Sequence, residues 1–232
     1  MSTLQKLSLA LVGTAVVFMS ANPANAITLT TGGTTPTPAG IFSTVPGVNT
    51  VTFESGSAPT SGFAKYSSAS GTPTVVQGSV GGQYAAPFGD ESNYLTISPI
   101  GSNVAGSTGS VTINFAQALD YFGLHWGSVD TYNSIAFFNG STLLNTFTGS
   151  QVPGTTASGN QTSPQDNVFV NFLADPGQTF DKVVLSSSGI AFETDNHSYR
   201  LASVPEPTAT LGLLAFGVMS AGSFVKRKSK LV

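Results

Sequence analysis

Short runs of alternating apolar and polar residues fill the middle of the chain, and Gly, Ser and Asn residues separate them. Alternation with a period of two is typical of strands that bury one face, and Phe122, Leu124 and Trp126 form the clearest example. Asn139-Gly140 lies between two such runs, and Asn-Gly is a strong hairpin signal because both residues tolerate a positive φ. The pattern predicts ten strands, at residues 51–54, 74–76, 94–97, 110–115, 120–126, 134–138, 143–147, 168–172, 182–186 and 190–199.

The same region has no convincing helical period and no repeat of fixed length. Many closely spaced strands without helices between them predict an all-β domain, an antiparallel β-sandwich over residues 51–203. Residues 27–50 are rich in Thr, Gly and Pro, and they predict a loose leader or an edge segment. The 232 residues suit one domain with processing segments at both ends.

The first 26 residues have the pattern of a secretory signal peptide. Lys6 supplies the positive charge, residues 7–19 are mostly apolar, and Ala24 and Ala26 form a small-residue cleavage site. Signal peptidase is therefore expected to cut before Ile27. The alternative is an uncleaved anchor helix, but the apolar stretch is short and the cleavage pattern is good.

The last residues combine three elements in a fixed order. A Pro-Glu-Pro tripeptide precedes an uncharged stretch at residues 208–225, which is long enough to cross a thin bilayer as a transmembrane helix, and a basic cluster follows it. This arrangement resembles the PEP-CTERM sorting signal of exosortase-dependent bacterial surface proteins. The resemblance implies recognition by an exosortase-type membrane protease and release to the cell surface or extracellular matrix; the alternative is a plain membrane anchor. The residues that carry it are Pro205, Glu206, Pro207, Lys226, Arg227 and Lys228.

Composition narrows the possible functions of the exported part. The chain has no Cys, which excludes disulfides, thiolate metal sites and a Cys nucleophile. Residues 27–203 hold ten acidic and three basic residues, a net charge of −7, so we expect no nucleic-acid partner. An acidic exported domain with clustered carboxylates favours Ca²⁺ as a ligand.

Two longer motifs, LDYFGLHWGSVDTYNSIAFFNG at 119–140 and FDKVVLSSSGIAFETDNHSY at 180–199, resemble the ectodomain of a family of exosortase-dependent surface proteins, many of them cyanobacterial. The resemblance implies a jelly-roll or lectin-like sandwich. The chain departs from the family pattern at His197, a position where members of that family tend to have an apolar residue.

In jelly-roll modules, carboxylates on an early strand and on the last strand often hold a structural Ca²⁺. The resemblance therefore implies a calcium site here, with ligands from the predicted strand 51–54 and the last strand. The alternative is that these side chains are ordinary edge residues. The candidate ligands are Glu54, Glu193, Asp195 and Asn196.

Sugar binding is predicted by an aromatic side chain with polar residues close behind it. Trp126 is the only Trp, and Asp130, Tyr132 and Asn133 follow it in a predicted loop. Aromatic rings stack on sugar rings while Asp and Asn bind hydroxyls. The alternative places Trp126 in the core, because it alternates with Phe122 and Leu124.

Catalytic motifs are absent from the sequence: there is no G-x-S-x-G elbow, no H-E-x-x-H and no phosphate-binding loop. We therefore expect a non-enzymatic, exported cell-surface or matrix protein that passes through the inner membrane and binds extracellular polysaccharide. One alternative is a purely structural or adhesive surface protein. Another is a secreted glycan hydrolase or lyase that uses Glu193 and Asp195 as its carboxylate pair.

Overall fold

The computed structural model describes residues 27–203, which form an all-β fold of antiparallel strands. Eleven strands and two 3₁₀ helices are present in these residues, with no α-helix. The strands are β1 (Ile27–Thr31), β2 (Asn49–Val51), β3 (Ala64–Ser67), β4 (Thr74–Gln77), β5 (Asn93–Ile97), β6 (Ser110–Gly127), β7 (Asn133–Asn139), β8 (Thr142–Thr148), β9 (Val168–Ala174), β10 (Phe180–Ser187) and β11 (Phe192–Leu201). The 3₁₀ helices are η1 (Gly149–Gln151) and η2 (Pro164–Asp166).

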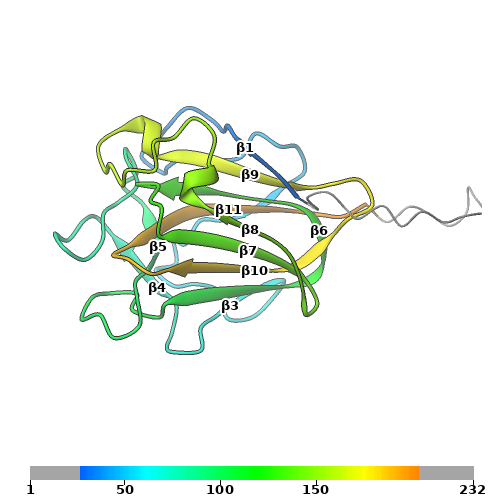
Figure 1. Ribbon diagram of the computed structural model, residues 1–232, viewed down its shortest axis with the longest axis horizontal. Helices are drawn as coiled ribbons and strands as arrows, with labels where there is room; N and C mark the ends of the chain where they lie inside the picture. Colours follow the sequence, from blue (N-terminus) through cyan, green and yellow to red (C-terminus); the bar gives the residue numbers. More distant parts are fainter. Residues whose placement is uncertain (1–26, 204–232) are drawn as a thin grey trace, which may run out of the picture.

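The long strand β6 belongs to two layers of a sandwich-like arrangement (Figure 1). Its first half pairs with β3 and β10, and β7 and β8 continue that layer. Its second half pairs with β11 and β9, and the strands β5, β4, β2 and β1 complete the second layer. Between the halves, residues 116–118 are exposed, and the pairing register with β10 shifts there. β6 therefore carries the chain from one layer into the other.

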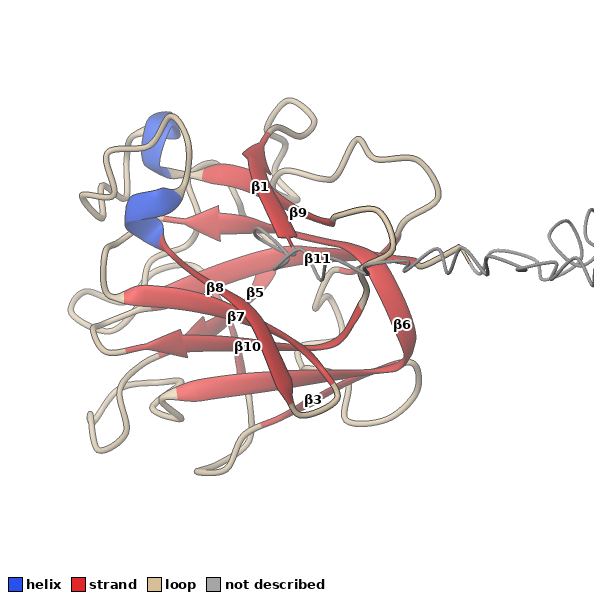
Figure 2. Ribbon diagram, turned by 45° about the vertical axis from the view of Figure 1, so that its right-hand side comes forward, coloured by secondary structure: helices blue, strands red, loops and turns tan. Residues whose placement is uncertain are grey.

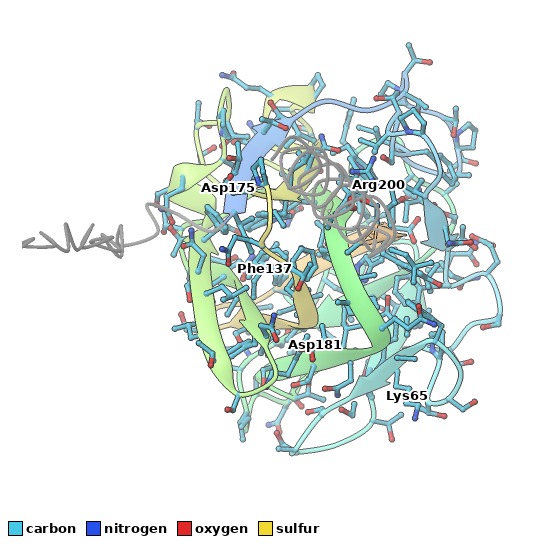
Figure 3. The ribbon with its side chains drawn as sticks, turned by 90° about the vertical axis from the view of Figure 1, so that its right-hand side faces the viewer. Lys65, Phe137, Asp175, Asp181 and Arg200 are labelled. Atoms are coloured by element: carbon cyan, nitrogen blue, oxygen red, sulfur yellow. The ribbon has the colours of Figure 1, made fainter. Side chains whose placement is uncertain are left out.

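Aromatic side chains fill the space between the two layers. Phe137 on β7 contacts Phe172 on β9, with ring centroids 4.8 Å apart, and Figure 3 shows Phe137 between the layers. The ring centroid of Phe122 on β6 lies 6.3 Å from that of Phe137. This core confirms the all-β, sandwich-like architecture that the alternation predicts.

A β-bulge at Asn196 changes which face of β11 its side chains occupy. The pairing of β11 with β6 shifts between Asp195 and Ser198, and Asn196 has a φ of 51°, a left-handed conformation that Asn tolerates well. Phe192 packs into the core before the bulge, whereas His197 does so after it. Tyr66 Oη lies 3.0 Å from His197 Nδ1, and Thr194 Oγ1 lies 2.9 Å from Nε2, so this residue is a hydrogen-bonded core histidine.

The segment 27–50 is part of this fold and lies at its edge. β1 pairs with β9 along its whole length, and the Ile27 side chain is buried in the core. Farther along, residues 33–45 cover the outer face of the β6–β11 layer, where the Ser43 hydroxyl lies 2.7 Å from Tyr121 Oη. Of the two expectations for this segment, the edge segment is the one observed.

Both ends of the described chain lie at the same end of the sandwich (Figures 1 and 2). Near the first described residue, the Thr28 hydroxyl on β1 donates a hydrogen bond to Asp175. Near the last one, Ser203 lines a pocket together with the same Asp175. Figure 3 looks onto this end. The ten residues of β11 run from it to the opposite end, a distance of about 30 Å at the rise of a strand.

Two side-chain amides bind the edge of β8, which pairs with β7 alone. The Thr146 N–H donates to Asn145 Oδ1 at 2.8 Å, and the Thr148 N–H donates to Gln151 Oε1 at 2.9 Å. An uncharged edge strand with free N–H groups is a template for pairing with a second chain. Asn145 and Gln151 occupy two of the groups that such pairing needs.

We predict that the double variant Asn145→Ala/Gln151→Ala associates through β8. Light scattering after size exclusion should show a mass that rises with protein concentration, while the wild type and the exposed-residue control Thr142→Ala keep a constant mass. An unchanged mass for the double variant over the same concentrations would contradict the protective role of the two amides.

Candidate functional site

The outer face of the β6–β11 layer is polar yet buried, because loops cover it. His125 on β6 and Glu193 and Asp195 on β11 point to this face, since Trp126 and Phe192 point into the core. The covering loops are residues 33–45, 79–92 and 157–167. The face therefore combines burial with charge, which a strand pattern alone does not require.

Glu193 lies where this buried layer reaches solvent. A pocket of about 110 Å³ is formed by residues 79–84 on one side and by Gln161, Ile190, Ala191 and Glu193 on the other. The Glu193 side chain is nearly enclosed, with 2% of the residue exposed. The Ala85 N–H donates to Oε1 at 2.9 Å, and the Ser128 hydroxyl donates to Oε2 at 3.4 Å.

Burial raises the pKa of Glu193 to about 7, and the hydrogen bond from the Ala85 N–H offsets part of that effect. The negative charge of Asp130 acts in the same direction as burial. Burial also raises the pKa of Tyr94 and Tyr132, whose hydroxyls feel the Glu193 charge. The pocket therefore holds a carboxyl group that is partly ionised near neutral pH.

Tyr132 and Asn133 hold the pocket wall at residues 190–191 from behind. The Tyr132 hydroxyl donates to the Ile190 carbonyl at 3.0 Å, and the Asn133 amide donates to the Ala191 carbonyl at 3.2 Å. The Tyr132 ring lies against Gly189, where any Cβ would come within 2.6 Å of it. Two residues predicted to bind sugar thus have a positioning role, and neither lines the pocket.

Trp126 does not form the sugar-binding platform that was one of its two predicted roles. Its side chain has no exposed surface and packs on Phe192, with ring centroids 4.7 Å apart. In the second half of β6 the even positions 122, 124 and 126 face the core, so the ring cannot meet a ligand from solvent. Asp130 is half-buried and does not line the pocket either. The alternative reading of Trp126 as a core residue is the one observed.

The four predicted calcium ligands are dispersed. Glu54 is exposed in a turn after β2, whereas Asp195 is fully buried. The Asn196 amide donates to the Ala39 and Ile41 carbonyls at 2.7 and 3.2 Å. These bonds hold the covering loop 33–45, so the Asn196 side chain does not join Glu193. Within residues 27–203, no three His, Asp or Glu side chains gather in the way a metal ion needs. Calcium binding stays a prediction.

A second buried cluster, which the sequence did not indicate, lies farther along the same face. Ser92 Oγ hydrogen-bonds to Asp90 and lies 3.2 Å from Asp195 Oδ2. His125 Nδ1 lies 3.6 Å from Asp90 Oδ2 and accepts a hydrogen bond from the Ile41 N–H at 3.4 Å. This Asp90–Asp195 cluster, with Ser92 and His125, joins β6, β11 and two covering loops.

The two carboxyl groups of this cluster take different protonation states. Burial raises the pKa of Asp195 to about 9, and the negative charge of Asp90 adds to the effect. Burial also opposes ionisation of Asp90, but the nearby His125 side chain and the hydrogen bonds from the Ser92 N–H and hydroxyl outweigh it and lower the pKa of Asp90. At neutral pH the pair therefore holds one proton, on Asp195, and one negative charge, on Asp90.

Gly40 fits against this cluster because it lacks a side chain. Its φ is 79°, and a Cβ would lie 2.7 Å from Asp90 Oδ2 and 2.9 Å from His125 Nδ1.

We predict that Gly40→Ala lowers the free energy of unfolding by about 2 kcal/mol. Two effects add up, the strain of a left-handed backbone at Ala and the crowding of its Cβ against the cluster. Urea denaturation checks this value, with Gly47→Ala as a control for backbone strain alone, since it has a φ of 75° and open space around it. Equal losses in the two variants would contradict the crowding.

Several predicted residues lie outside the described part of the chain. These are the cleavage-site residues Ala24 and Ala26, the sorting motif Pro205, Glu206 and Pro207, and the basic residues Lys226, Arg227 and Lys228. The predicted transmembrane helix at 208–225 is also outside it. Ile27, the expected first residue after cleavage, begins β1. Among residues 27–203, no helix has the length and apolar character to cross a membrane.

Comparison with protein-family models, with curated proteins and with solved structures finds no match for this chain.

Proposed function

We propose that this chain is a non-enzymatic, exported protein of the cell surface or extracellular matrix, and that the Glu193 pocket binds extracellular polysaccharide. In this proposal signal peptidase removes residues 1–26, and an exosortase-type protease processes the Pro-Glu-Pro segment after a transient stay in the inner membrane. The sandwich-like domain is assigned as jelly-roll or lectin-like on the basis of the two sequence motifs.

The position of the pocket is the observation that carries the proposal. Both segments proposed to direct export join the domain at one end, through Ile27 and Ser203. The pocket lies at the other end of β11, about 30 Å away. A domain held near a membrane or surface by its ends would thus turn the pocket toward the surroundings.

The lining of the pocket supports a hydroxyl-rich ligand. Gln83, Gln161 and Ser79 provide amide and hydroxyl groups, and Glu193 provides a buried acceptor. Small-molecule sites commonly combine a few such polar groups with apolar contacts. A two-carboxylate hydrolase fits less well, because Asp195 is hydrogen-bonded within the buried cluster and does not line the pocket.

Two experiments test the two parts of the proposal. The intact mass of the protein recovered from its native surface or medium should correspond to a chain from residue 27 to about residue 204. Retention of residues 208–232 would contradict the proposed sorting.

Pull-down on insoluble polysaccharides should retain the purified domain. Absence of binding to every polysaccharide would favour a purely structural or adhesive role.

A further inference from the structure

Glu193 is a buried carboxylate at a pocket without a basic partner in the described part of the chain. Three basic side chains occur in residues 27–203, and each lies elsewhere. Arg200 pairs with Asp120 at 2.8 Å, Lys182 lies 4.4 Å from the centre of the Phe138 ring, and Lys65 is on β3 in the other layer. The charge on Glu193 is thus compensated by neutral hydrogen-bond donors, the Ala85 N–H, the Ser128 hydroxyl and the backbone of Glu193 itself.

The rest of the lining offers further acceptors and keeps the site open to a charged donor. Gln161 carries an amide oxygen, and Gln83 carries a second one, which already accepts from the Ala105 N–H at 3.4 Å and keeps one lone pair. Gly81 and Gly82 leave the backbone bare, with no atom within 4 Å of a Cβ at either position. A protonated amine carries three hydrogen-bond donors and a positive charge, and its bonds to carboxylates are stronger than neutral ones. It would supply what the Glu193 carboxylate lacks.

We propose that the Glu193 pocket binds the protonated amine of an amino-sugar residue in a polysaccharide, with the Glu193 carboxylate as its counter-ion. The inference rests on the proposed polysaccharide-binding function and names the sugar class. A bound ammonium group would lower the raised pKa of Glu193 and restore its ionised form, and the nearby Asp130 charge would attract the same cation.

The dimensions of the pocket agree with an amine that enters while the sugar ring stays at the mouth. A volume of about 110 Å³ is smaller than the roughly 300–1,000 Å³ of typical small-molecule sites. At the mouth, Val80 and Ile190 are 40% and 46% exposed. Their apolar surfaces can pack against the C–H face of a ring, a contact that suits a pyranose.

A divalent cation is a weaker occupant for this pocket. Ca²⁺ takes six to eight oxygen ligands, usually with several carboxylates among them. Glu193 is the only acidic residue that lines the pocket. An ammonium group needs fewer ligands and tolerates amide and backbone oxygens, so the lining matches it better.

The test compares three β-1,4-linked hexasaccharides that differ at one position of the sugar: a glucosamine, an N-acetylglucosamine and a glucose oligomer. Calorimetric titration at pH 7, where Glu193 is partly ionised, should give the tightest binding to the glucosamine oligomer. Glu193→Gln keeps the shape and should weaken that binding at least about tenfold, the effect of losing one charge-assisted hydrogen bond. The matched control Glu54→Gln removes an exposed carboxylate outside the pocket and should bind like the wild type.

A second variant separates loss of the site from loss of the fold. Gly81 has open space around it and no left-handed φ, so Gly81→Leu should fill the pocket mouth without disturbing the strands. We expect it to abolish binding while the melting temperature stays within a few degrees of the wild type. If Glu193→Gln unfolds, Gly81→Leu still tests the site.

The outcomes distinguish this inference from the proposed function. Equal affinity for all three oligomers, unchanged in Glu193→Gln, would overturn the amine inference and leave polysaccharide binding in place. No binding of any oligomer or polysaccharide would overturn both. Binding of CaCl₂ alone that disappears in Glu193→Gln would overturn the amine inference in favour of a cation site.

Discussion

Trp126→Ala should lower the free energy of unfolding by about 3–5 kcal/mol, the usual cost of removing a large aromatic side chain from a core. The indole is fully buried and packs on Phe192, so its removal leaves a cavity between the layers. Single domains are stable by only about 5–15 kcal/mol, and the variant should therefore be partly unfolded at 37 °C. Urea denaturation followed by far-UV circular dichroism measures the loss, because the variant has no Trp fluorescence.

Trp126→Phe is the matched variant that separates packing from binding. Among residues 27–203 the indole N–H has no hydrogen-bond partner, so a Phe ring loses volume but no polar contact there. We expect this variant to stay folded and to bind polysaccharide as the wild type does. A folded Trp126→Phe protein that no longer binds would mean that the ring contacts ligand and would contradict its assignment to the core.

Local alternation was sufficient to predict the strands whose partners are close in the sequence. The pair β7 and β8 flanks the turn at Asn139-Gly140 as expected, and their register joins Asn139 to Thr142. The two predicted strands at 110–115 and 120–126 are one strand, β6. Residues 116–118 interrupt the alternation because they form the bend between the layers, and an interruption in the sequence looks like a turn.

Strands β1 and β3 were not predicted because neither shows enough alternation to detect in the sequence. β1 pairs with β9 more than a hundred residues later, and only Ile27 among its five residues is buried. A mixture of Thr and Gly around such a strand gives little alternation to detect. β3 has a buried-exposed alternation over just four residues, which is too short to distinguish from chance.

The candidate site was predicted in part, and the reason lies in the bulge and the loops. The sequence pointed to Glu193, Asp195 and Asn196 as neighbours that share a function. In the structure, Glu193 lines a pocket, Asp195 joins Asp90 in a buried cluster through the Ser92 hydroxyl, and Asn196 forms the bulge. Their different partners come from loops about 100–160 residues earlier, so no local pattern contained that information.

Stability should fall as the pH rises from 7 to 9, and Asp195 should be the main cause. Its folded pKa of about 9 lies far above the ordinary value of 3.8, so the folded state binds its proton more tightly than the unfolded state does. The favourable contribution of that proton is present at low pH and is lost as the pH rises toward 9. At about 1.4 kcal/mol per pH unit, the loss from pH 7 to 9 reaches up to about 3 kcal/mol.

The other buried groups act outside the range from pH 7 to 9, the tyrosines above it because burial raises their pKa values beyond the ordinary 10. Glu193, raised to about 7, has the same sign as Asp195 but exerts its effect between its ordinary value of 4.5 and 7. Burial lowers the pKa of His197 from 6.5 to about 3, so its contribution is lost as the pH falls from 6.5 toward 3. The loss above pH 7 is therefore attributable to Asp195.

Asp195→Asn should remove most of the loss of stability between pH 7 and 9. The amide is neutral at every pH, and its N–H can donate to the Asp90 carboxylate in place of the acid proton. Urea denaturation at pH 6, 7, 8 and 9 measures the slope for the wild type, for Asp195→Asn and for the control Glu91→Gln, which alters an exposed carboxylate on the same covering loop. The control should keep the wild-type slope. If the free energy of unfolding of Asp195→Asn falls with pH as steeply as that of the wild type, the group that loses its proton between pH 7 and 9 is not Asp195.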